Sequence, residues 1–275
     1  MITSCHYNIW GYRMSSEMDI FLEQMKSEVD IFAFTEVTDT QNALDEEECF
    51  YSDDASEPPQ LIGAASRVKS FLEPAFRCEY DTATRKDFKC METGSVFSNV
   101  GFGSMLCWNT SLHSVDHGTI DIPGSEKTSP RILQYLVFEK NEEWYLFAHF
   151  HGIWIRGNTK GDDEDGLRIQ QSKLVRNSLR KVAAKFNVKK IIVGGDFNLD
   201  IDTKALEVLA GDGYRNLIVE HGIKSTRSNL YRYWETNKTM FADYVITSDA
   251  VHTKKFLVAK AVDASDHLPL ITTFK

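Results

Sequence analysis

The sequence predicts a mixed α/β fold, and two observations carry that prediction. Apolar segments of strand length alternate with amphipathic helical segments in the earlier part of the chain, and a run of strands follows in the later part. The 275 residues are 42% hydrophobic, which is enough to bury a large core. No repeat of fixed period and no low-complexity linker divides the chain, so we expect residues 1–275 to form one domain.

The first elements alternate between strand and helix. Residues 2–9 and 30–37 are apolar segments of strand length, and a helix is expected between them from about Ser16, which resembles the start of a capping box. After an acidic loop at 38–59, a second amphipathic helix is expected over about residues 60–73. The apolar positions at helical spacing in the first helix are Met18, Phe21, Leu22, Met25 and Val29.

The middle of the chain favours strands. Residues 101–108, 131–139 and 144–150 are expected to form three strands, with a polar loop at 110–130. Residues 74–99 are compatible with either strand or helix.

The later part of the chain begins with a loop at 151–166 that is rich in glycine and charge. The longest helix starts at Leu167, and a short helix is expected at about 203–210. A central strand from Ile191 lies between these two helices. The final strands are expected at about 242–248, 254–261 and 268–274.

The central strand ends in Gly194-Gly195-Asp196-Phe197-Asn198. In an extended segment, Asp196 and Asn198 lie on one side and Phe197 points into the core. An acid and an amide placed in this way can hold a water molecule and a phosphate oxygen together. The same residues are also typical of an ordinary strand-to-loop turn.

The charge of the chain limits the class of partner. Lys and Arg number 31, and Asp and Glu number 40, which gives a net charge of −9. Duplex-binding proteins usually offer a broad basic face, because neutralisation of phosphates supplies most of their affinity. We therefore expect weak binding to duplex DNA. The acidic residues cluster at 39–57, which is most simply a solvated loop.

The cysteines and the absence of export signals indicate a location. The five cysteines are an odd number without metal-ligand spacing, so we expect reduced thiols. Strand-like sequence begins at Ile2 instead of a signal peptide, and no apolar run reaches the roughly twenty residues that span a bilayer. These features predict a soluble, cytoplasmic protein without a transmembrane segment. The cysteines are Cys5, Cys49, Cys78, Cys90 and Cys107.

Motifs at strand ends carry a family resemblance. In chain order they are Tyr7-Asn8-Ile9-Trp10-Gly11, Asp30 to Val37, His151-Gly152, Gly195-Asp196-Phe197-Asn198, Phe241-Ala242-Asp243-Tyr244 and Ser265-Asp266-His267-Leu268-Pro269. Together they resemble the endonuclease/exonuclease/phosphatase superfamily, which includes pancreatic-type deoxyribonuclease, apurinic endonucleases, inositol-polyphosphate 5-phosphatases and neutral sphingomyelinases. The resemblance covers residues 2–274. It implies a four-layer, deoxyribonuclease-like α/β sandwich, in which two packed mixed β-sheets are flanked by helices and the site lies at the strand ends.

The resemblance also implies a Mg²⁺ site, for which Mn²⁺ can substitute. Glu36 and Asp266 match the positions of the metal-binding carboxylates, and Asn8 matches an asparagine that contacts the water shell of the metal. Mg²⁺ prefers oxygen ligands and keeps several waters, so one or two carboxylates suffice. Without the resemblance, Glu36 is equally compatible with a salt-bridged strand end and Asn8 with a turn cap.

A catalytic histidine is expected at His151, directly before the loop that follows its strand. His149 competes for this role, since it lies two residues earlier on the same face. Arg168 and Gln171 begin the next helix and resemble the Arg-x-x-Gln of the family. We expect these two residues to brace the strand end.

The remaining catalytic candidates follow from the same resemblance. Asp196 and Asn198 would hold the attacking water. Asp243 would orient the imidazole of His267, as in hydrolase triads. Adjacent Asp266 and His267 would serve the metal and the phosphate together.

Substrate contacts are expected from arginines and aromatics. Arg131 resembles a phosphate-contacting arginine of the deoxyribonucleases, although an ordinary surface arginine is as compatible with the sequence. In the loop 225–239, arginines alternate with aromatic residues, a pattern suited to bind a phosphate and stack bases; these residues are Arg227, Tyr231, Arg232, Tyr233 and Trp234. The aromatic side chains are equally suited to pack the loop onto the sheet.

The sequence therefore predicts a Mg²⁺-dependent phosphoesterase, with a nuclease acting on single-stranded or nicked nucleic acid as the favoured form. The alternatives are a phosphatase or a sphingomyelinase-like phospholipase C of the same superfamily. A non-catalytic binding module is disfavoured, because every core motif residue is present.

Overall fold

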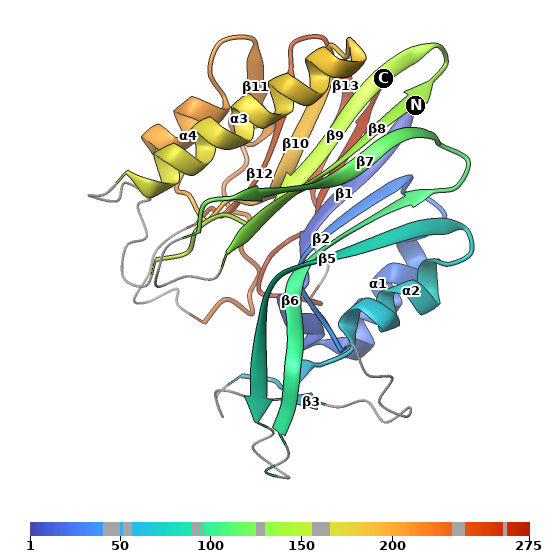
Figure 1. Ribbon diagram of the computed structural model, residues 1–275, viewed down its shortest axis with the longest axis vertical. Helices are drawn as coiled ribbons and strands as arrows, with labels where there is room; N and C mark the ends of the chain where they lie inside the picture. Colours follow the sequence, from blue (N-terminus) through green and yellow to red (C-terminus); the bar gives the residue numbers. More distant parts are fainter. Residues whose placement is uncertain are drawn as a thin grey trace.

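A computed structural model describes residues 1–40, 50–51, 57–89, 94, 96–124, 130–155, 166–232, 240–260 and 263–275. Two six-stranded sheets pack face to face, and helices cover their outer faces (Figure 1). The predicted four-layer α/β sandwich of two mixed sheets is confirmed.

The first sheet contains both chain ends. Its order is β13 (Thr253–Val258), β14 (Leu270–Phe274), β1 (Ile2–Asn8), β2 (Ile31–Asp39), β6 (Val96–Asn109) and β5 (Phe76–Lys89). Strands β1 and β2 are parallel, whereas the other neighbours are antiparallel. A short pair formed by β3 (Phe50–Tyr51) and β4 (Gln60–Leu61) lies beside it, near the 3-10 turn η1 (Trp10–Tyr12).

The second sheet has the same plan. Its order is β11 (Tyr214–Asn216), β12 (Asp243–Ser248), β10 (Lys190–Asp196), β9 (Glu143–Phe150), β8 (Arg131–Lys140) and β7 (His113–Ile122). Strands β9 and β10 are parallel, and the other neighbours are antiparallel.

The helices divide between the two outer faces. Helices α1 (Ser15–Met25) and α2 (Ala64–Leu72) share a hydrophobic cluster with the first sheet, while α3 (Leu167–Phe186), α4 (Lys204–Leu209) and α5 (Leu217–Glu220) pack with the second. In Figure 1, α1 and α2 lie on one side of the sandwich and α3 on the other. Alternation along β1 produces this layering, because Ile2 belongs to the inter-sheet cluster and Cys5 and Tyr7 to the helix-facing cluster.

The two parallel pairs bring functional residues to one edge. Asn8 ends β1, and Asp196 ends β10. Asp243 begins β12, which runs antiparallel to β10, so Asp243 lies directly opposite Asp196. The loop before β14 approaches the same edge, because β14 runs antiparallel to β1.

Two long strands were not predicted, and neither were the short strands β3, β4 and β11. Residues 74–99 contain β5, and the expected polar loop at 110–130 contains β7. Strand β7 lies at a sheet edge and exposes polar side chains along most of its length. Backbone pairing with β8, and not the burial of an apolar face, holds β7 in place. Its sequence therefore has no clear alternation of apolar and polar residues.

The expected capping box at Ser16 is wrong. Helix α1 begins after Met14 without a side-chain cap. Asp19, the acidic residue of the expected box, accepts a hydrogen bond of 2.6 Å from the Tyr12 hydroxyl and pairs with Arg67. The carboxylate therefore ties α1 to η1 and α2 instead of capping its own helix.

Among the described residues, Cys5, Cys78 and Cys107 are buried free thiols, whereas Cys49 and Cys90 lie outside them. No helix in the described part of the chain is long and apolar enough to cross a membrane.

Candidate phosphoester-hydrolysis site

Glu36 projects from an irregularity in β2. The pairing of β2 with β6 shifts between Thr35 and Val37, which makes Glu36 the extra residue of a β-bulge. Its φ is 58°, a left-handed conformation that is strained for a side chain with a Cβ atom. Such outliers gather at functional sites, and this one places the carboxylate beside Asn8.

Asn8 links the two sheets at this point. Its Nδ2 donates to Glu36 Oε1 at 3.0 Å and to Asp196 Oδ2 at 2.9 Å, and lies 3.4 Å from His267 Nε2. Its Oδ1 accepts a hydrogen bond of 2.9 Å from the backbone N–H of Trp10. The amide therefore joins one carboxylate of the first sheet, one of the second and an imidazole.

Asp196 is held by the turn that follows β10. Its Oδ1 accepts the backbone N–H of Asn198 at 2.9 Å, and Asn198 has a φ of 53°. The chain therefore turns instead of continuing as the straight segment expected from the sequence. Phe197 points into the core as expected, and its ring stacks on Phe150 at 4.4 Å. Gly195 is required here, because a Cβ atom would lie 2.3 Å from the carbonyl oxygen of Phe150.

His151 lies at the same centre. Its Nε2 is 3.6 Å from Asp196 Oδ2 and 3.9 Å from Glu36 Oε1. The following backbone N–H, of Gly152, donates to the Asp196 carbonyl at 2.7 Å. A Cβ atom on Gly152 would lie 2.1 Å from the Phe197 carbonyl oxygen, so the close approach of the two strand ends requires glycine.

The expected bracing residues contact the segment after His151. Arg168 Nε donates to the Ile153 carbonyl at 3.0 Å, and Gln171 Oε1 accepts the Ile153 N–H at 3.2 Å. Both side chains are buried. They fix the backbone that carries His151.

His149 lies elsewhere. Its Nε2 is 2.7 Å from Gln134 Oε1, and the ring is fully buried in the inter-sheet layer. Because β9 ends at Phe150, His151 turns toward the carboxylates and His149 stays within the sheet.

His267 and Asp243 form a buried pair. His267 Nδ1 lies 2.8 Å and 3.0 Å from the two carboxylate oxygens of Asp243. Thr226 Oγ1 accepts the backbone N–H groups of Asp243 and Ala242 at 3.2 and 3.1 Å, which fixes the strand start. The other nitrogen, His267 Nε2, is 3.6 Å from Asp196 Oδ2.

Arg227 is inserted beside these groups. Its backbone forms an antiparallel bridge with His267, and its Nη1 donates to His267 Nε2. The same Nη1 is 3.8 Å from Asp266 Oδ2, and the guanidinium lies 4.4 Å from the centroid of the Tyr231 ring. The sequence predicts a single loop at 225–239. Its first residues in fact pair with the His267 segment, and no local pattern signals such a long-range contact.

Arg131 faces the same centre from β8. It is buried, and its Nε donates to the Gly152 carbonyl at 3.0 Å. A narrow crevice runs beside it, lined among others by Phe102, Ser104 and His151. Tyr233 and Trp234, predicted to contact substrate, lie outside the described residues.

Burial dominates the electrostatics of the centre. It raises the pKa of Glu36, Asp196 and Asp266, and that of Asp243 to about 7. Burial, followed by the charge of Arg227, lowers the pKa of His267 to about 4. The carboxylates are therefore crowded and poorly solvated, and the imidazole is neutral.

These residues fit a divalent cation. Ligand atoms of Glu36, His151 and Asp196 lie within 4.8 Å of one another, as do those of Asp196, Asp243 and His267. Asp266 Oδ1 is buried and has no hydrogen-bond partner among the described residues. A buried oxygen without a partner, among crowded carboxylates, suits a hard cation with oxygen ligands.

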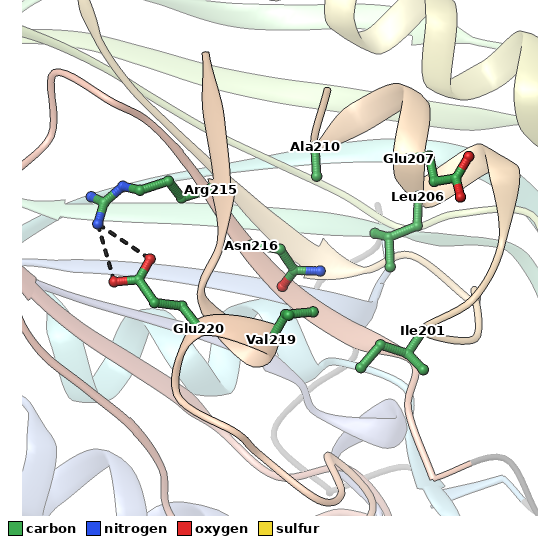
Figure 2. Close-up of a pocket in the computed structure, with 8 residues that line it drawn as sticks. All are labelled: Ile201, Leu206, Glu207, Ala210, Arg215, Asn216, Val219 and Glu220. Carbon is green, nitrogen blue, oxygen red and sulfur yellow. Dashed lines mark hydrogen bonds and ion pairs between the residues drawn. The ribbon is translucent and has the colours of Figure 1, made fainter. Parts of the chain in front are cut away.

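A larger hollow lies away from this centre, beside β11, α4 and α5. Its volume is about 380 Å³, and apolar side chains form much of its wall (Figure 2). Its two carboxylates are Glu207 and Glu220, and Glu220 pairs with Arg215 at 3.1 Å. Its greater size does not make this hollow the candidate active site, because the residues that line it include no histidine and no converging carboxylates.

Comparisons with known proteins identify the family and the fold. The Endonuclease/Exonuclease/phosphatase family model matches residues 5–267. The fold is similar to that of a mannosyl-6-phosphatase of Bacteroides thetaiotaomicron, with a TM-score of 0.69, 16% identity and full coverage of both chains. It is also similar to the human Nocturnin catalytic domain with bound sulfate anion, with a TM-score of 0.66 and 16% identity, covering 100% of this chain and 93% of that one.

A truncated Caenorhabditis elegans TDP2 has a TM-score of 0.62 and 15% identity, with 99% of this chain and 96% of that one covered. No curated protein matches the sequence.

Proposed function

This chain belongs to the endonuclease/exonuclease/phosphatase family, and from that membership we propose that it hydrolyses phosphodiester bonds with Mg²⁺, preferentially in single-stranded or nicked nucleic acid. The reaction class, phosphoester hydrolysis, follows from the family, whereas the substrate and the identity of the metal are the proposal. The observation that carries it is the link that Asn8 makes between Glu36, Asp196 and His267 at the edge of both sheets.

Glu36 and Asp266 would hold the metal, with Asn8 placed to order its water shell. Bound Mg²⁺ would neutralise the phosphate and stabilise the leaving oxygen. In the free protein, the Asn8 amide donates to both Glu36 and Asp196, which reduces repulsion between the two carboxylates. The carboxylates are thereby kept together before a cation binds.

Asp196 and Asn198 would position the attacking water. As the water oxygen bonds to phosphorus, the bond between phosphorus and the leaving oxygen breaks, and a proton of the water passes to the Asp196 carboxylate. Burial raises the pKa of this carboxyl, which makes it a stronger base than an exposed aspartate. Oδ2 of Asp196 would accept the proton, because it is the oxygen that lies 3.6 Å from both His151 and His267 at the centre. It accepts one hydrogen bond from Asn8 Nδ2, which leaves it a lone pair for the proton.

His267 and Arg227 would bind the phosphate oxygens. Asp243 accepts the Nδ1–H of His267, which fixes the tautomer and leaves Nε2 directed at the centre. Arg227 donates to that Nε2 in the free protein and would turn its remaining N–H groups to the phosphate.

His151 would stabilise the transition state. Burial, followed by the charge of Arg131, lowers its pKa, so the ring is neutral near pH 7. A neutral imidazole donates a hydrogen bond to developing charge more readily than it gives up a proton, which favours this role over protonation of the leaving group.

Charge favours a flexible nucleic acid as the substrate. The net charge of −9 disfavours a long duplex, whereas Arg131 and Arg227 supply local positive charge at the centre. The Tyr233-Trp234 pair would stack one or two unpaired bases.

A phosphatase acting on phosphate monoesters is the second candidate, and a sphingomyelinase-like phospholipase C is the third. The phosphatase is favoured by similarity to a Bacteroides protein named as a mannosyl-6-phosphatase over the full length of both chains. Two guanidinium groups also suit a phosphate dianion, that of the buried Arg131 and that of Arg227, whose side chain is 9% exposed.

A substrate panel tests the proposal. Plasmid DNA, single-stranded DNA, RNA, a sugar phosphate, inositol phosphates and sphingomyelin would each be assayed with Mg²⁺, with Mn²⁺ and with excess chelator. We expect the highest kcat/KM on single-stranded nucleic acid. Turnover of only a monoester or a lipid would replace the nuclease proposal with the corresponding alternative.

A further inference from the structure

Two arginines from distant parts of the chain bind a single carboxylate. Arg13 Nη2 lies 2.8 Å from Glu57 Oε2, and Arg232 Nη2 lies 2.9 Å from Glu57 Oε1. Arg13 also donates to the Pro58 carbonyl and lies 5.4 Å from the centroid of the Trp10 ring. The side chains of Arg13 and Glu57 are only 5% and 13% exposed, and that of Arg232 is 32% exposed.

Both arginines of this Arg13–Glu57–Arg232 cluster lie next to segments that contact residues of the candidate active site. Arg13 follows η1, whose first residue Trp10 donates to Asn8. Arg232 follows Tyr231, on which the Arg227 guanidinium lies.

The two guanidinium groups and the one carboxylate of the cluster together carry a net charge of +1. Each carboxylate oxygen of Glu57 forms an ion pair with a different arginine. A phosphate offers the same arrangement of charged oxygen acceptors to paired guanidinium groups.

We propose that Arg13 and Arg232 form a second anion subsite, which receives a phosphate of the substrate next to the scissile one and which Glu57 occupies in the free protein. This proposal rests on the proposed phosphoesterase function and specifies its substrate class as an ester that carries at least two phosphates. Trp10, beside Arg13, would form one wall of the subsite.

Binding of non-hydrolysable probes tests the subsite without requiring turnover. Methylphosphonate offers one anionic group and methylenebisphosphonate offers two. Calorimetry on the full chain in excess Mg²⁺ gives the dissociation constant of each. We expect the two-anion probe to bind more tightly than the one-anion probe.

Glu57→Gln and Arg232→Gln have opposite expected effects. Removing the internal competitor in Glu57→Gln should tighten methylenebisphosphonate binding by roughly 3-fold to 10-fold, and Arg232→Gln should weaken it about 10-fold. Binding of methylphosphonate should change by less than about 2-fold in either variant. Arg232 carries the test because Arg13 is buried, and its replacement would disturb packing as well as charge.

Glu220→Gln is the matched control, since it also removes the carboxylate of an arginine pair but lies at the separate hollow (Figure 2). It should leave the affinity for both probes unchanged. Weaker bisphosphonate binding in Glu57→Gln would mean that Glu57 only positions the arginines, and this result would overturn the proposal. Equal effects of Arg232→Gln on both probes would overturn it too.

Two further pairs of ligands identify the source of the second phosphate. Thymidine dinucleotide with and without a 5′-phosphate represents nucleic acid, and inositol 1,4-bisphosphate with inositol 1-phosphate represents a small polyphosphate. If Arg232→Gln lowers the affinity only for the two-phosphate member of one pair, that pair identifies the substrate class. If Arg232→Gln loses affinity in neither pair, the subsite is refuted. If the bisphosphonate binds as expected but no nucleic acid is cleaved, only the nuclease proposal is refuted.

Discussion

His267 Nδ1 lies 2.8 Å from Asp243 Oδ2, and both side chains are buried at the edge shared by the two sheets. The pair fixes which imidazole nitrogen carries the proton, since the acceptor at Nδ1 is a carboxylate. Its other nitrogen then faces Arg227 and Asp196. The orientation of His267 therefore depends on Asp243.

Asp243→Asn should lower kcat by roughly 10²–10⁴-fold, because an amide that donates to Nδ1 would favour the wrong tautomer. The effect should be non-additive with His267→Ala, so that the double variant is little worse than either single one. Steady-state kinetics on all three variants measure this. Full additivity would show that Asp243 does not act through His267.

Chelator should abolish activity, and Mg²⁺ or Mn²⁺ should restore it. Glu36→Gln should lose most turnover while remaining folded, since the neutral amide removes a charge that Asp196 repels. Its thermal midpoint should equal or exceed that of the wild type. Glu23→Gln, on the exposed side of α1, is the control. Full activity of Glu36→Gln, or of the wild type in excess chelator, would exclude this metal site.

His151→Ala should reduce kcat by roughly 10²-fold or more, because its ring lies beside two carboxylates of the centre. His149→Ala should have a much smaller effect on kcat and should mainly lower stability, since His149 is packed between the sheets. Kinetics and thermal unfolding on both variants distinguish the two roles. A larger loss of kcat in His149→Ala would reverse the assignment.

His149 should make folding sensitive to acid. Burial, followed by the charge of His6, lowers its pKa to about 3. A group whose folded pKa is below its unfolded value of about 6.5 contributes stability that is present above pH 6.5 and is lost as pH falls toward 3. This histidine alone should account for a loss of about 2 kcal/mol between pH 7 and pH 5.

The measurement is the free energy of unfolding in urea at both pH values. His149→Gln should lose about 2 kcal/mol less than the wild type over this interval, because glutamine does not titrate and can still donate to Gln134. Comparing the variants cancels the contributions of the buried carboxylates, which have the opposite sign. Equal losses in both proteins would show that His149 does not titrate upon unfolding.

Replacing both Tyr233 and Trp234 by Ala should raise KM on single-stranded nucleic acid, since each stacked base contributes roughly 1–3 kcal/mol. A small generic phosphodiester has no base, so its KM should be almost unchanged. Equal losses on the two substrates would indicate that the aromatic pair only supports the fold.

The order of the strands and helices along the chain was largely predictable from local sequence patterns. Buried strands such as Ile31–Asp39 and the long helix α3 have clear apolar periodicity, so they were found within a few residues. Strands β5 and β7 were not found, because pairing with neighbours holds them in place more than an apolar face does. Strand pairing is a relation between distant residues, which a local window does not contain.

The sequence by itself determined the family and named polar strand-end residues such as Glu36, Asp196 and His267, since a motif preserves residue types and their order along the chain. Only the tertiary structure decided how they meet. The bulge at Glu36 depends on the register between β2 and β6, and the contact of Arg227 with His267 joins residues 40 positions apart. Both depend on which strand ends the packed sheets bring to one edge, and that is fixed by burial across the whole core.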